Sequence, residues 1–368
     1  MRAHSHASGR ERILVRCPNW LGDVVMATPG LRALREARPE AEIVAQLPAP
    51  LAPLLAGSGL CDALWPVTPR ASGLGAMRRD AKRIAAHRFD LGIAIPESIS
   101  SALLMRWGRV RHSIGFARDP VRRWLLDEVV QAPAQSGRRR LVSRERFVLQ
   151  LMAAAGSSAG DTRLHLRVTP EEEARLDVVL SRRGASLEGL RGAPPIVIAP
   201  GAGFGESKCW PVESFAALAD RLVARGRSVV VLGAPGEGPR LGALKRAMRS
   251  ECLILDGVLD VGAVKALLRV ARALVSNDAG ARHVAAAFAV QSVVFFGPTS
   301  VAKTADNLAA IEVLETEHAC RPCYRRRCPV DHRCLRSIAV DEAESALDRA
   351  LERAEGAVFA PSVRGGRA

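Results

Sequence analysis

Residues 274–296 have the sequence LVSNDAGARHVAAAFAVQSVVFF, which contains the most informative pattern of the chain. It opens on an apolar strand pattern at 274–275, turns at Asn277-Asp278-Ala279-Gly280, continues as a helical pattern over 280–288 and closes on a second apolar strand at 293–296. Strands that are apolar throughout and separated by helices are typical of a parallel sheet covered on both faces. In such a sheet the loops that follow the strands carry the ligand-binding residues. The segment therefore predicts a Rossmann-like α/β domain with a binding loop at its centre.

The same alternation runs through both halves of the chain. In the second half it predicts strands at 196–198, 229–232 and 253–255 and helices at 212–225, 239–248 and 261–271, the last capped by Asp260. In the first half it predicts strands at 13–15, 42–47 and 90–95 and helices at 74–87 and 147–155. Residues 181–195, rich in Gly, Arg, Ser and Pro, are predicted to be a linker.

The expected organisation follows from this alternation. It comprises a disordered leader at 1–11, one domain at 12–185, a second at 190–345 and a C-terminal helix end and tail at 346–368. Two such α/β domains in tandem predict a ligand cleft between them, at the carboxyl ends of the strands.

The composition indicates a basic protein. The 368 residues include 53 Lys and Arg against 38 Asp and Glu, a net charge of +15, and residues 106–146 alone hold 11 arginines against 4 acidic residues. A basic face favours anionic partners, namely nucleic acid, acidic lipid headgroups or phosphorylated glycans, and a merely solvated surface is the alternative. Aromatic residues make up 4% of the chain, too few for base stacking, which counts against nucleic acid. With no stretch of about 18 apolar residues and no apolar run in its leader, the protein is expected in the cytoplasm.

Three loops of the second half point to a phosphate ligand. The helix start at Gly280 offers free N–H groups and the positive end of a helix dipole, and the ring of His283 lies on its first turn. The loop at 200–211 contains three glycines and Lys208, although it lacks the residue order of a P-loop. Glu237, after the strand at 229–232, is placed to accept hydrogen bonds from ribose hydroxyls. The absence of a G-x-G-x-x-G after a strand argues against a nicotinamide dehydrogenase.

Asp23 follows the first strand, in the segment Cys17-Pro18-Asn19-Trp20-Leu21-Gly22-Asp23. One interpretation is an N-cap, a role that Asp fills well. The other is a carboxylate at the cleft, acting as general base on an acceptor hydroxyl. Its position in the sequence leaves both open.

Four motifs follow one another along the chain, namely Trp20-Leu21-Gly22-Asp23, Pro200-Gly201 with Lys208-x-Trp210-Pro211, Asn277-Asp278-x-Gly280-x-x-His283 and Gly297-Pro298-Thr299. Taken together, they resemble a known family, the lipopolysaccharide heptosyltransferases of glycosyltransferase family 9, in particular the heptosyltransferase II branch. The resemblance holds in order over residues 12–345.

The resemblance implies the GT-B architecture, in which two Rossmann-like domains face a central cleft, acceptor on the first and nucleotide sugar on the second. It implies an inverting transfer of heptose from ADP-L-glycero-D-manno-heptose to a heptosyl-Kdo-lipid A acceptor, at the inner membrane surface and without a cofactor. By the same resemblance Asp23 is the base, and the donor-binding residues are Lys208, Glu237, Asp278, Ala279, Gly280 and His283. The family usually has Ser or Thr at the position of Ala279, so one side-chain hydroxyl to phosphate is missing here.

The arginines of the first half have a plausible partner in this reaction. Arg118, Arg122 and Arg123 are expected to bind the phosphates and acidic sugars of the membrane-anchored acceptor.

Four cysteines form the pattern Cys320-x-x-Cys323-x4-Cys328-x5-Cys334, within a loop at 318–336. In a reducing compartment such density favours a metal over disulfides, and thiolates at these spacings suit structural zinc or an iron–sulfur centre. Free thiols, or a disulfide that forms only under some conditions, are the alternative. The arginines at 321–327 would also suit a loop that faces the acceptor.

Other functions remain to be weighed against heptose transfer. A GT-B enzyme that uses another nucleotide sugar and an inactive relative both fit the sequence, the second because of Ala279. A basic nucleic-acid-binding protein with a cysteine–metal module is the candidate from a different class, and it would show steeply salt-dependent binding.

Overall fold

The computed structural model describes residues 9–67, 73–117, 119–131, 142–158 and 160–359. For residues 356–359 it describes the backbone alone. Its contacts divide the chain into two compact units. Unit 1 runs to Thr169 and also includes Ala302–Asn307, whereas unit 2 consists of Pro170–Val301 and the chain from Leu308 onward. Each unit is described by itself.

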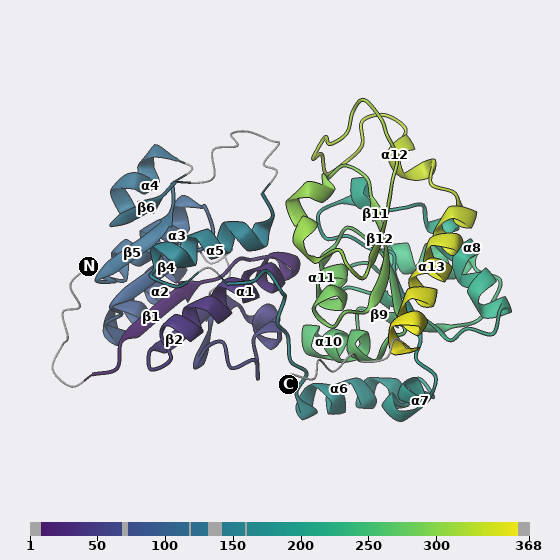
Figure 1. Ribbon diagram of the computed structural model, residues 1–368, viewed down its shortest axis with the longest axis horizontal. Coiled ribbons are helices and arrows are strands. Elements are labelled where there is room, and N and C mark those ends of the chain that lie inside the picture. Colours follow the sequence, from purple (N-terminus) through teal and green to yellow (C-terminus); the bar gives the residue numbers. More distant parts are fainter. Residues whose placement is uncertain (1–8, 68–72, 118, 132–141, 159, 360–368) are drawn as a thin grey trace, which may run out of the picture. The chain divides into compact units, whose positions relative to one another are not determined.

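Unit 1 is built around a six-stranded sheet in the order β3-β2-β1-β4-β5-β6, in which every neighbouring pair is parallel (Figure 1). The strands are β1 (Arg12–Arg16), β2 (Glu42–Pro48), β3 (Ala63–Val67), β4 (Leu91–Ala94), β5 (His112–Phe116) and β6 (Glu128–Val130). The helices are α1 (Leu21–Ala37), η1 (Ala49–Leu54), α2 (Gly73–His87), α3 (Ile99–Trp107), α4 (Pro120–Leu125) and α5 (Arg144–Ala154). Side chains on both faces of β1 and β4 are buried, as a parallel sheet between helices requires.

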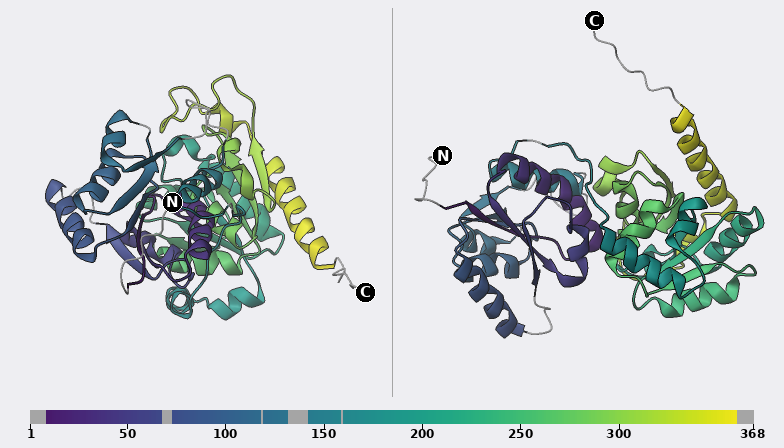
Figure 2. Two further views of the ribbon diagram at one scale, coloured as in Figure 1. Left: turned by 60° about the vertical axis from the view of Figure 1, so that its left-hand side comes forward. Right: turned by 90° about the horizontal axis from the view of Figure 1, so that it is seen from below.

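Unit 2 repeats this plan with the strand order β12-β11-β10-β7-β8-β9, again parallel throughout. The strands are β7 (Ile196–Ala199), β8 (Val229–Gly233), β9 (Leu253–Asp256), β10 (Ala273–Asn277), β11 (Gln291–Phe296) and β12 (Ile311–Glu315). The helices are α6 (Pro170–Ser181), α7 (Leu187–Gly192), η3 (Glu206–Lys208), α8 (Val212–Ala224), α9 (Gly238–Ala247), α10 (Val261–Val270), α11 (Gly280–Ala287), α12 (Arg333–Arg336) and α13 (Val340–Phe359). The short helix η4 (Val301–Asn307) belongs to unit 1 except for its first residue. Helices cover both faces of each sheet (Figure 2).

The core of unit 2 lies between its sheet and the helices α8 and α13. Trp210 is fully buried there, with its ring stacked on Phe295 at 4.2 Å between centroids and edge-on to Phe215 at 5.0 Å. The indole N–H donates to the carbonyl of Ile338 (3.1 Å), so burial leaves no polar atom of this ring unsatisfied.

The boundary between the units lies earlier than the predicted linker. Residues 181–195 are not a loose connection, because they contain α7 and follow α6, and both helices belong to unit 2. An ion pair at 3.0 Å between Glu172 of α6 and Lys265 of α10, with both side chains buried, fixes α6 to this unit. The sequence gives no sign of this contact, because Glu172 and Lys265 are far apart along the chain.

The predicted elements agree with the observed ones in most places. The strands and helices expected between 196 and 296 are all present within a few residues, and Asp260 caps α10 by accepting from the N–H of Ala263 at 2.7 Å. The sequence pattern did not predict, among others, the short elements β3, β5, β6, α3, α4, α7 and β12. It also did not predict α6 or most of α13. Most of the leader, which was expected to be disordered, and the end of the tail from residue 360 onward fall outside the described residues.

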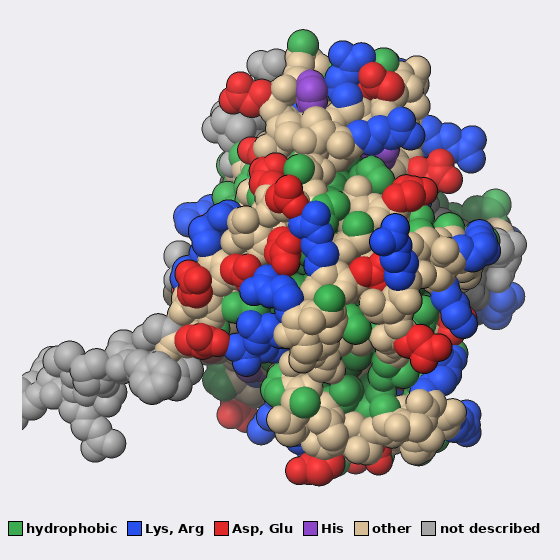
Figure 3. Space-filling model, turned by 90° about the vertical axis from the view of Figure 1, so that its right-hand side faces the viewer, with side chains coloured by type: hydrophobic (Ala, Val, Ile, Leu, Met, Phe, Trp, Pro, Cys, Tyr) green, Lys and Arg blue, Asp and Glu red, His purple; other side chains and the backbone are tan. Residues whose placement is uncertain are grey.

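On the face shown in Figure 3, Lys and Arg side chains lie among Asp and Glu side chains. Arg225 of α8, for example, binds Glu344 and Asp348 of α13, each at 3.0 Å. A balanced, solvated surface therefore accounts for the arginines of this face.

Candidate functional site

The loop that follows β10 holds a buried carboxylate surrounded by donors. One oxygen of Asp278 accepts from the Nζ of Lys208 and from the hydroxyl of Thr299, both at 2.7 Å, and the other accepts from the Nε of Arg282, also at 2.7 Å. Lys208 additionally donates to the backbone carbonyl of Asp278 at 2.8 Å. Two cations and one anion therefore meet here, which leaves a net positive charge. We call these four residues the Asp278 cluster.

The charges of the Asp278 cluster set its protonation. Burial alone would raise the pKa of Asp278, but the neighbouring charges of Arg282 and Lys208 outweigh it and hold the pKa well below the usual range. Asp278 is thus ionised at neutral pH. The ionised carboxylate has no hydrogen to donate, and the partners it accepts from are Lys208, Arg282 and Thr299.

His283 is buried on the first turn of α11. Burial, and then the charge of Arg282, lower the pKa of its ring well below that of an ordinary histidine. The imidazole is therefore neutral at physiological pH, and it can offer a phosphate a hydrogen bond but not a positive charge.

The start of α11 has the properties of an anion site. Its N-cap residue is Ala279, which has no side-chain group to accept from the first N–H groups. These N–H groups and the helix dipole favour an anion at Gly280. The predicted binding loop thus lies directly beside the Asp278 cluster, which supplies the positive side chains.

The loop with Lys208 is held by neighbours on two sides. Asn277, the last residue of β10, donates from Nδ2 to the carbonyl of Pro200 (2.8 Å) and accepts at Oδ1 from the N–H of Trp210 (2.9 Å). Ser207 is tied to the cysteine-rich loop, because its N–H donates to the carbonyl of Arg326 (3.2 Å) and its own carbonyl lies 2.7 Å from Nε2 of His332. The residues that precede and follow Lys208 are therefore both held by hydrogen bonds, and this fixes the position of Lys208.

Glu237 lies against the same loop. Its Oε2 accepts from the N–H of Ala234 at 2.9 Å, and a Cβ added to Gly201 would meet its Oε1 at 1.8 Å. Only glycine fits at position 201 with Glu237 in this place. The structure therefore brings the predicted donor residues of unit 2 to one edge of its sheet, at the carboxyl ends of β7, β8 and β10.

In unit 1, Asp23 lies in the first turn of α1 and is partly exposed. The N-cap position of this helix is Trp20, whose side chain makes no capping hydrogen bond. Asp23 is therefore not the N-cap residue of α1, and the interpretation of Asp23 as an N-cap is wrong. The segment before it is anchored by Arg16, which donates from Nη2 to Oδ1 of Asn19 at 2.5 Å and from Nη1 to the carbonyl of Gln46 at 3.1 Å.

The three arginines expected to bind the acceptor differ in burial and in whether the structure describes them. Arg118 lies outside the described residues. Arg122 is fully buried, where its Nε donates to the carbonyl of Phe116 at 2.7 Å and its Nη1 to the hydroxyl of Ser101 at 2.9 Å. The prediction that Arg122 contacts the acceptor at the surface is therefore wrong, because its buried guanidinium joins α3 and α4. Arg123 is exposed.

The cysteine-rich loop holds free thiols. Cys320 is exposed, Cys323 and Cys328 are partly buried and Cys334 is buried, where desolvation raises the pKa of its thiol. Among the described residues, no three His, Cys, Asp or Glu side chains are gathered so that they could hold a metal ion. The geometry therefore gives the predicted metal ligands no support.

Two residues of the Asp278 cluster were absent from the predicted site, Arg282 and Thr299. A signal for Arg282 was available, because it lies four residues after Asp278, a spacing at which helical side chains meet. Thr299 stands in the Gly297-Pro298-Thr299 motif, but its hydrogen bond to Asp278 depends on the neighbouring positions of β10 and β11 in the sheet.

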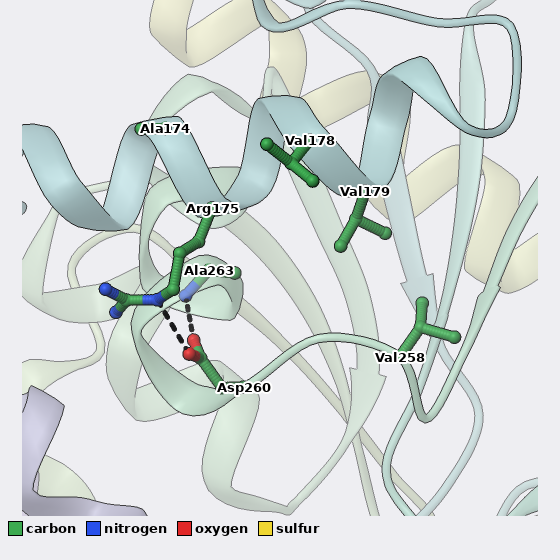
Figure 4. A pocket seen from close by; sticks show the side chains of 7 residues that line it. All are labelled: Ala174, Arg175, Val178, Val179, Val258, Asp260 and Ala263. Atoms are coloured by element: carbon green, nitrogen blue, oxygen red, sulfur yellow. Dashed lines mark hydrogen bonds and ion pairs between the residues drawn. The ribbon is translucent and has the colours of Figure 1, made fainter.

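A separate pocket of about 360 Å³ lies between α6 and the start of α10 (Figure 4). Its charged residues are already engaged with one another, since Nε of Arg175 lies 2.8 Å from Oδ2 of Asp260, which also caps α10. The remainder of its lining is apolar, so no ligand is assigned to it. Its lining residues are Ala174, Arg175, Val178, Val179, Val258, Asp260 and Ala263.

Comparison with known proteins gives a consistent result. Residues 77–333 match the family described as glycosyltransferase family 9 (heptosyltransferase). The chain is 30% identical over 299 residues to lipopolysaccharide heptosyltransferase 2 of Salmonella typhimurium, covering 78% of this chain and 83% of that protein. It is 28% identical over 309 residues to the Escherichia coli protein of the same name, with the same coverage of both.

Solved structures agree with these sequence matches. The E. coli ADP-heptose lps heptosyltransferase II is 25% identical, with a TM-score of 0.76 over 94% of this chain and 99% of that one. A glycosyltransferase family 9 protein from Veillonella parvula is 20% identical, with a TM-score of 0.79 over 95% of this chain and 100% of that one. The predicted α/β class and GT-B type are confirmed by the two parallel sheets and by these likenesses. The chain is a glycosyltransferase that belongs to glycosyltransferase family 9, the heptosyltransferase family.

Proposed function

We propose that the protein transfers heptose from ADP-L-glycero-D-manno-heptose to the heptosyl-Kdo-lipid A acceptor of the lipopolysaccharide inner core. The observation that carries this proposal is the Asp278 cluster beside the uncapped start of α11. A net positive, partly buried site next to free helix N–H groups suits the diphosphate of a nucleotide sugar. The names of the relatives, lipopolysaccharide heptosyltransferase 2 and ADP-heptose lps heptosyltransferase II, point to the same donor and acceptor.

The proposed reaction is an inverting displacement. The acceptor oxygen attacks the anomeric carbon, the bond from that carbon to the diphosphate breaks, and Asp23 takes the hydroxyl proton. The electron pair of the broken bond leaves with ADP, whose charge Lys208 and the N–H groups at the start of α11 stabilise. Glu237 accepts hydrogen bonds from the ribose, and His283 donates one uncharged hydrogen bond to the phosphates.

The acceptor side of the proposal concerns the membrane surface. The acceptor is anchored in a bilayer, whereas no helix of the described residues is long and apolar enough to cross one. We propose that the protein works in the cytoplasm, on the inner membrane surface. Of the arginines expected at the acceptor, exposed Arg123 is the one that the described structure leaves available for phosphates or acidic sugars.

The cysteine-rich loop enters the proposal only as a structural element. The transfer as written requires no metal. Structural zinc or iron bound by Cys320, Cys323, Cys328 and Cys334 would require these side chains to move closer together than they are here. Metal analysis of the purified protein tests this part, and a stoichiometric metal that is lost in the Cys323→Ser variant would support it.

The test of the function is ADP release from ADP-heptose with a truncated core acceptor. The wild type should release ADP only when donor and acceptor are both present. Asp23→Asn should lower kcat by about 10²–10⁴-fold, the contribution of a positioned base. The same assay with UDP- and GDP-sugars tests the alternative donor. Turnover with one of those and none with ADP-heptose would overturn the proposal, and so would wild-type turnover by Asp23→Asn.

A further inference from the structure

An exposed apolar surface lies at one edge of the sheet of unit 1. Trp124 on α4 is 86% exposed, Val121 on the same helix is 49% exposed, and Ile99 at the start of α3 is 42% exposed. We call these three residues the Trp124 surface. β4 leads into α3 and β5 leads into α4, and the two strands pair in parallel, so both helices begin at the carboxyl edge of the sheet (Figure 1).

The Trp124 surface is fixed from beneath by the buried Arg122. Its guanidinium donates to the carbonyl of Phe116 at the end of β5 (2.7 Å), to the carbonyl of Ser98 and to the hydroxyl of Ser101 (2.9 Å). Ser98 is the N-cap residue of α3, so one buried side chain ties the two short helices together. The exposed apolar side chains therefore stand on two helices that are held in place by hydrogen bonds, and not on an unsupported loop.

The same edge of the sheet carries Asp23. β1 pairs with β4 in parallel, and α1, which contains Asp23 in its first turn, begins just after β1. The carboxyl ends of β1, β4 and β5 lie next to one another in the strand order of this sheet. A membrane contact at this edge of the sheet would bring a bilayer-anchored acceptor to the edge that carries Asp23.

We infer that the Trp124 surface docks the protein on an anionic lipid bilayer, an inference that rests on the proposed function because the acceptor is lipid-anchored. The indole ring has an apolar body and a polar N–H, and tryptophan accumulates at the membrane–water interface for this reason. Exposed Arg123 lies between Val121 and Trp124 in sequence and supplies a cation for lipid phosphates. Three apolar side chains and one cation give a weak and reversible contact, as suits an enzyme that moves between acceptors.

Binding of the full chain to vesicles tests the inference directly. The vesicles contain phosphatidylcholine alone or with phosphatidylglycerol, and binding is measured by flotation and by the fluorescence shift of tryptophan. Trp124→Ser should lower partitioning to the anionic vesicles by about tenfold, the effect of keeping one large apolar side chain in water. Trp124→Phe should retain most of the binding. The matched control is Val178→Ser, which changes a side chain on α6 of unit 2 that is 51% exposed. This variant should bind the vesicles as the wild type does.

Circular dichroism confirms that each variant is folded. Equal partitioning of Trp124→Ser and wild type would overturn the inference, as would a wild type that binds neutral and anionic vesicles equally. Loss of a dimer in Trp124→Ser, seen by sedimentation without any change in vesicle binding, would assign the surface to a second copy of the chain and overturn it too.

Activity separates this inference from the proposed function. Trp124→Ser should lose transfer to acceptor embedded in vesicles while keeping wild-type transfer to a deacylated, soluble acceptor. Failure of the wild type on both acceptors would refute the proposed function. Wild-type activity on both, matched by Trp124→Ser on both, would refute only the docking surface.

Discussion

Lys208 and Asp278 form an ion pair of 2.7 Å in which the two side chains are only 14% and 9% exposed. The pair joins two loops that are 70 residues apart in sequence, one after β7 and one after β10. Arg282 binds the second oxygen of the same carboxylate, so Asp278 would keep a charged partner if Lys208 bound the proposed ligand. This arrangement makes Lys208 available to a phosphate without leaving a buried carboxylate uncompensated.

Removing the carboxylate should destabilise the protein. Asp278→Asn leaves Lys208 and Arg282 close together without their counter-ion, and breaking a buried pair from one side costs about 3–5 kcal/mol. We expect the free energy of unfolding in urea to fall by that amount. Asp348→Asn, which removes a surface partner of Arg225, is the control and should change it by about 1 kcal/mol or less. Equal losses in the two variants would contradict the role assigned to the cluster.

Removing the cation should affect the donor more than the fold. Lys208→Met takes away a charge that faces the diphosphate, and a charge-assisted hydrogen bond contributes about 1.5–3 kcal/mol, or roughly 10- to 150-fold in affinity. We expect the Kd for ADP, measured by calorimetry, to rise by that factor. Arg282→Met should weaken ADP less, because its Nε is engaged by Asp278. A stronger effect of Arg282→Met would mean that Arg282 contacts the phosphates itself.

Restoring a hydroxyl at the N-cap of α11 should have two separable effects. Ala279→Ser supplies an acceptor for the free N–H groups of the first turn and should stabilise the ligand-free protein by about 1 kcal/mol. It also offers a hydroxyl to the donor phosphate, so the KM for ADP-heptose should fall by about tenfold. Ala279→Val is the control, since it adds volume without a hydrogen bond. A rise in stability without a change in KM would place the donor away from this helix start.

The neutral state of His283 predicts a loss of stability in mild acid. Because its pKa is lowered in the folded protein, the unfolded chain binds a proton below the ordinary histidine pKa of about 6.5 while the folded protein does not. Stability is therefore greatest above about pH 6.5 and falls by about 1.4 kcal/mol for each pH unit below it, down to the folded pKa. Urea unfolding at pH 7.5, 6.5 and 5.5 measures this slope. His283→Gln should flatten it, and an unchanged slope would assign the effect to another group.

How far the sequence predicted this protein can be judged from particular residues. Gly280 and Asp278 were identified because strand, turn and helix are consecutive in sequence, and local patterns report consecutive elements well. Asp23 was placed correctly after the first strand, but the first-turn position that rules out the N-cap is a matter of one to three residues, below the accuracy of boundary prediction. Arg122 was expected to bind the acceptor, and only its contacts with Phe116 and Ser101 show that it is buried. Arginine is rarely buried, so the sequence carries no signal for this position.

Two parallel α/β units, and the loops in which a phosphate ligand would lie, could be predicted from local patterns, because hydrophobic periodicity and glycine-containing turns are properties of neighbouring residues. The partners of those residues could not be predicted in this way, because they depend on the folded chain. Lys208 meets Asp278 because β7 and β10 are neighbours in the sheet although they are far apart in sequence. Glu172 meets Lys265 in the same way, which moves the boundary between the units to Pro170. Strand order and burial fix these charges, and neither is written in the local pattern of side chains.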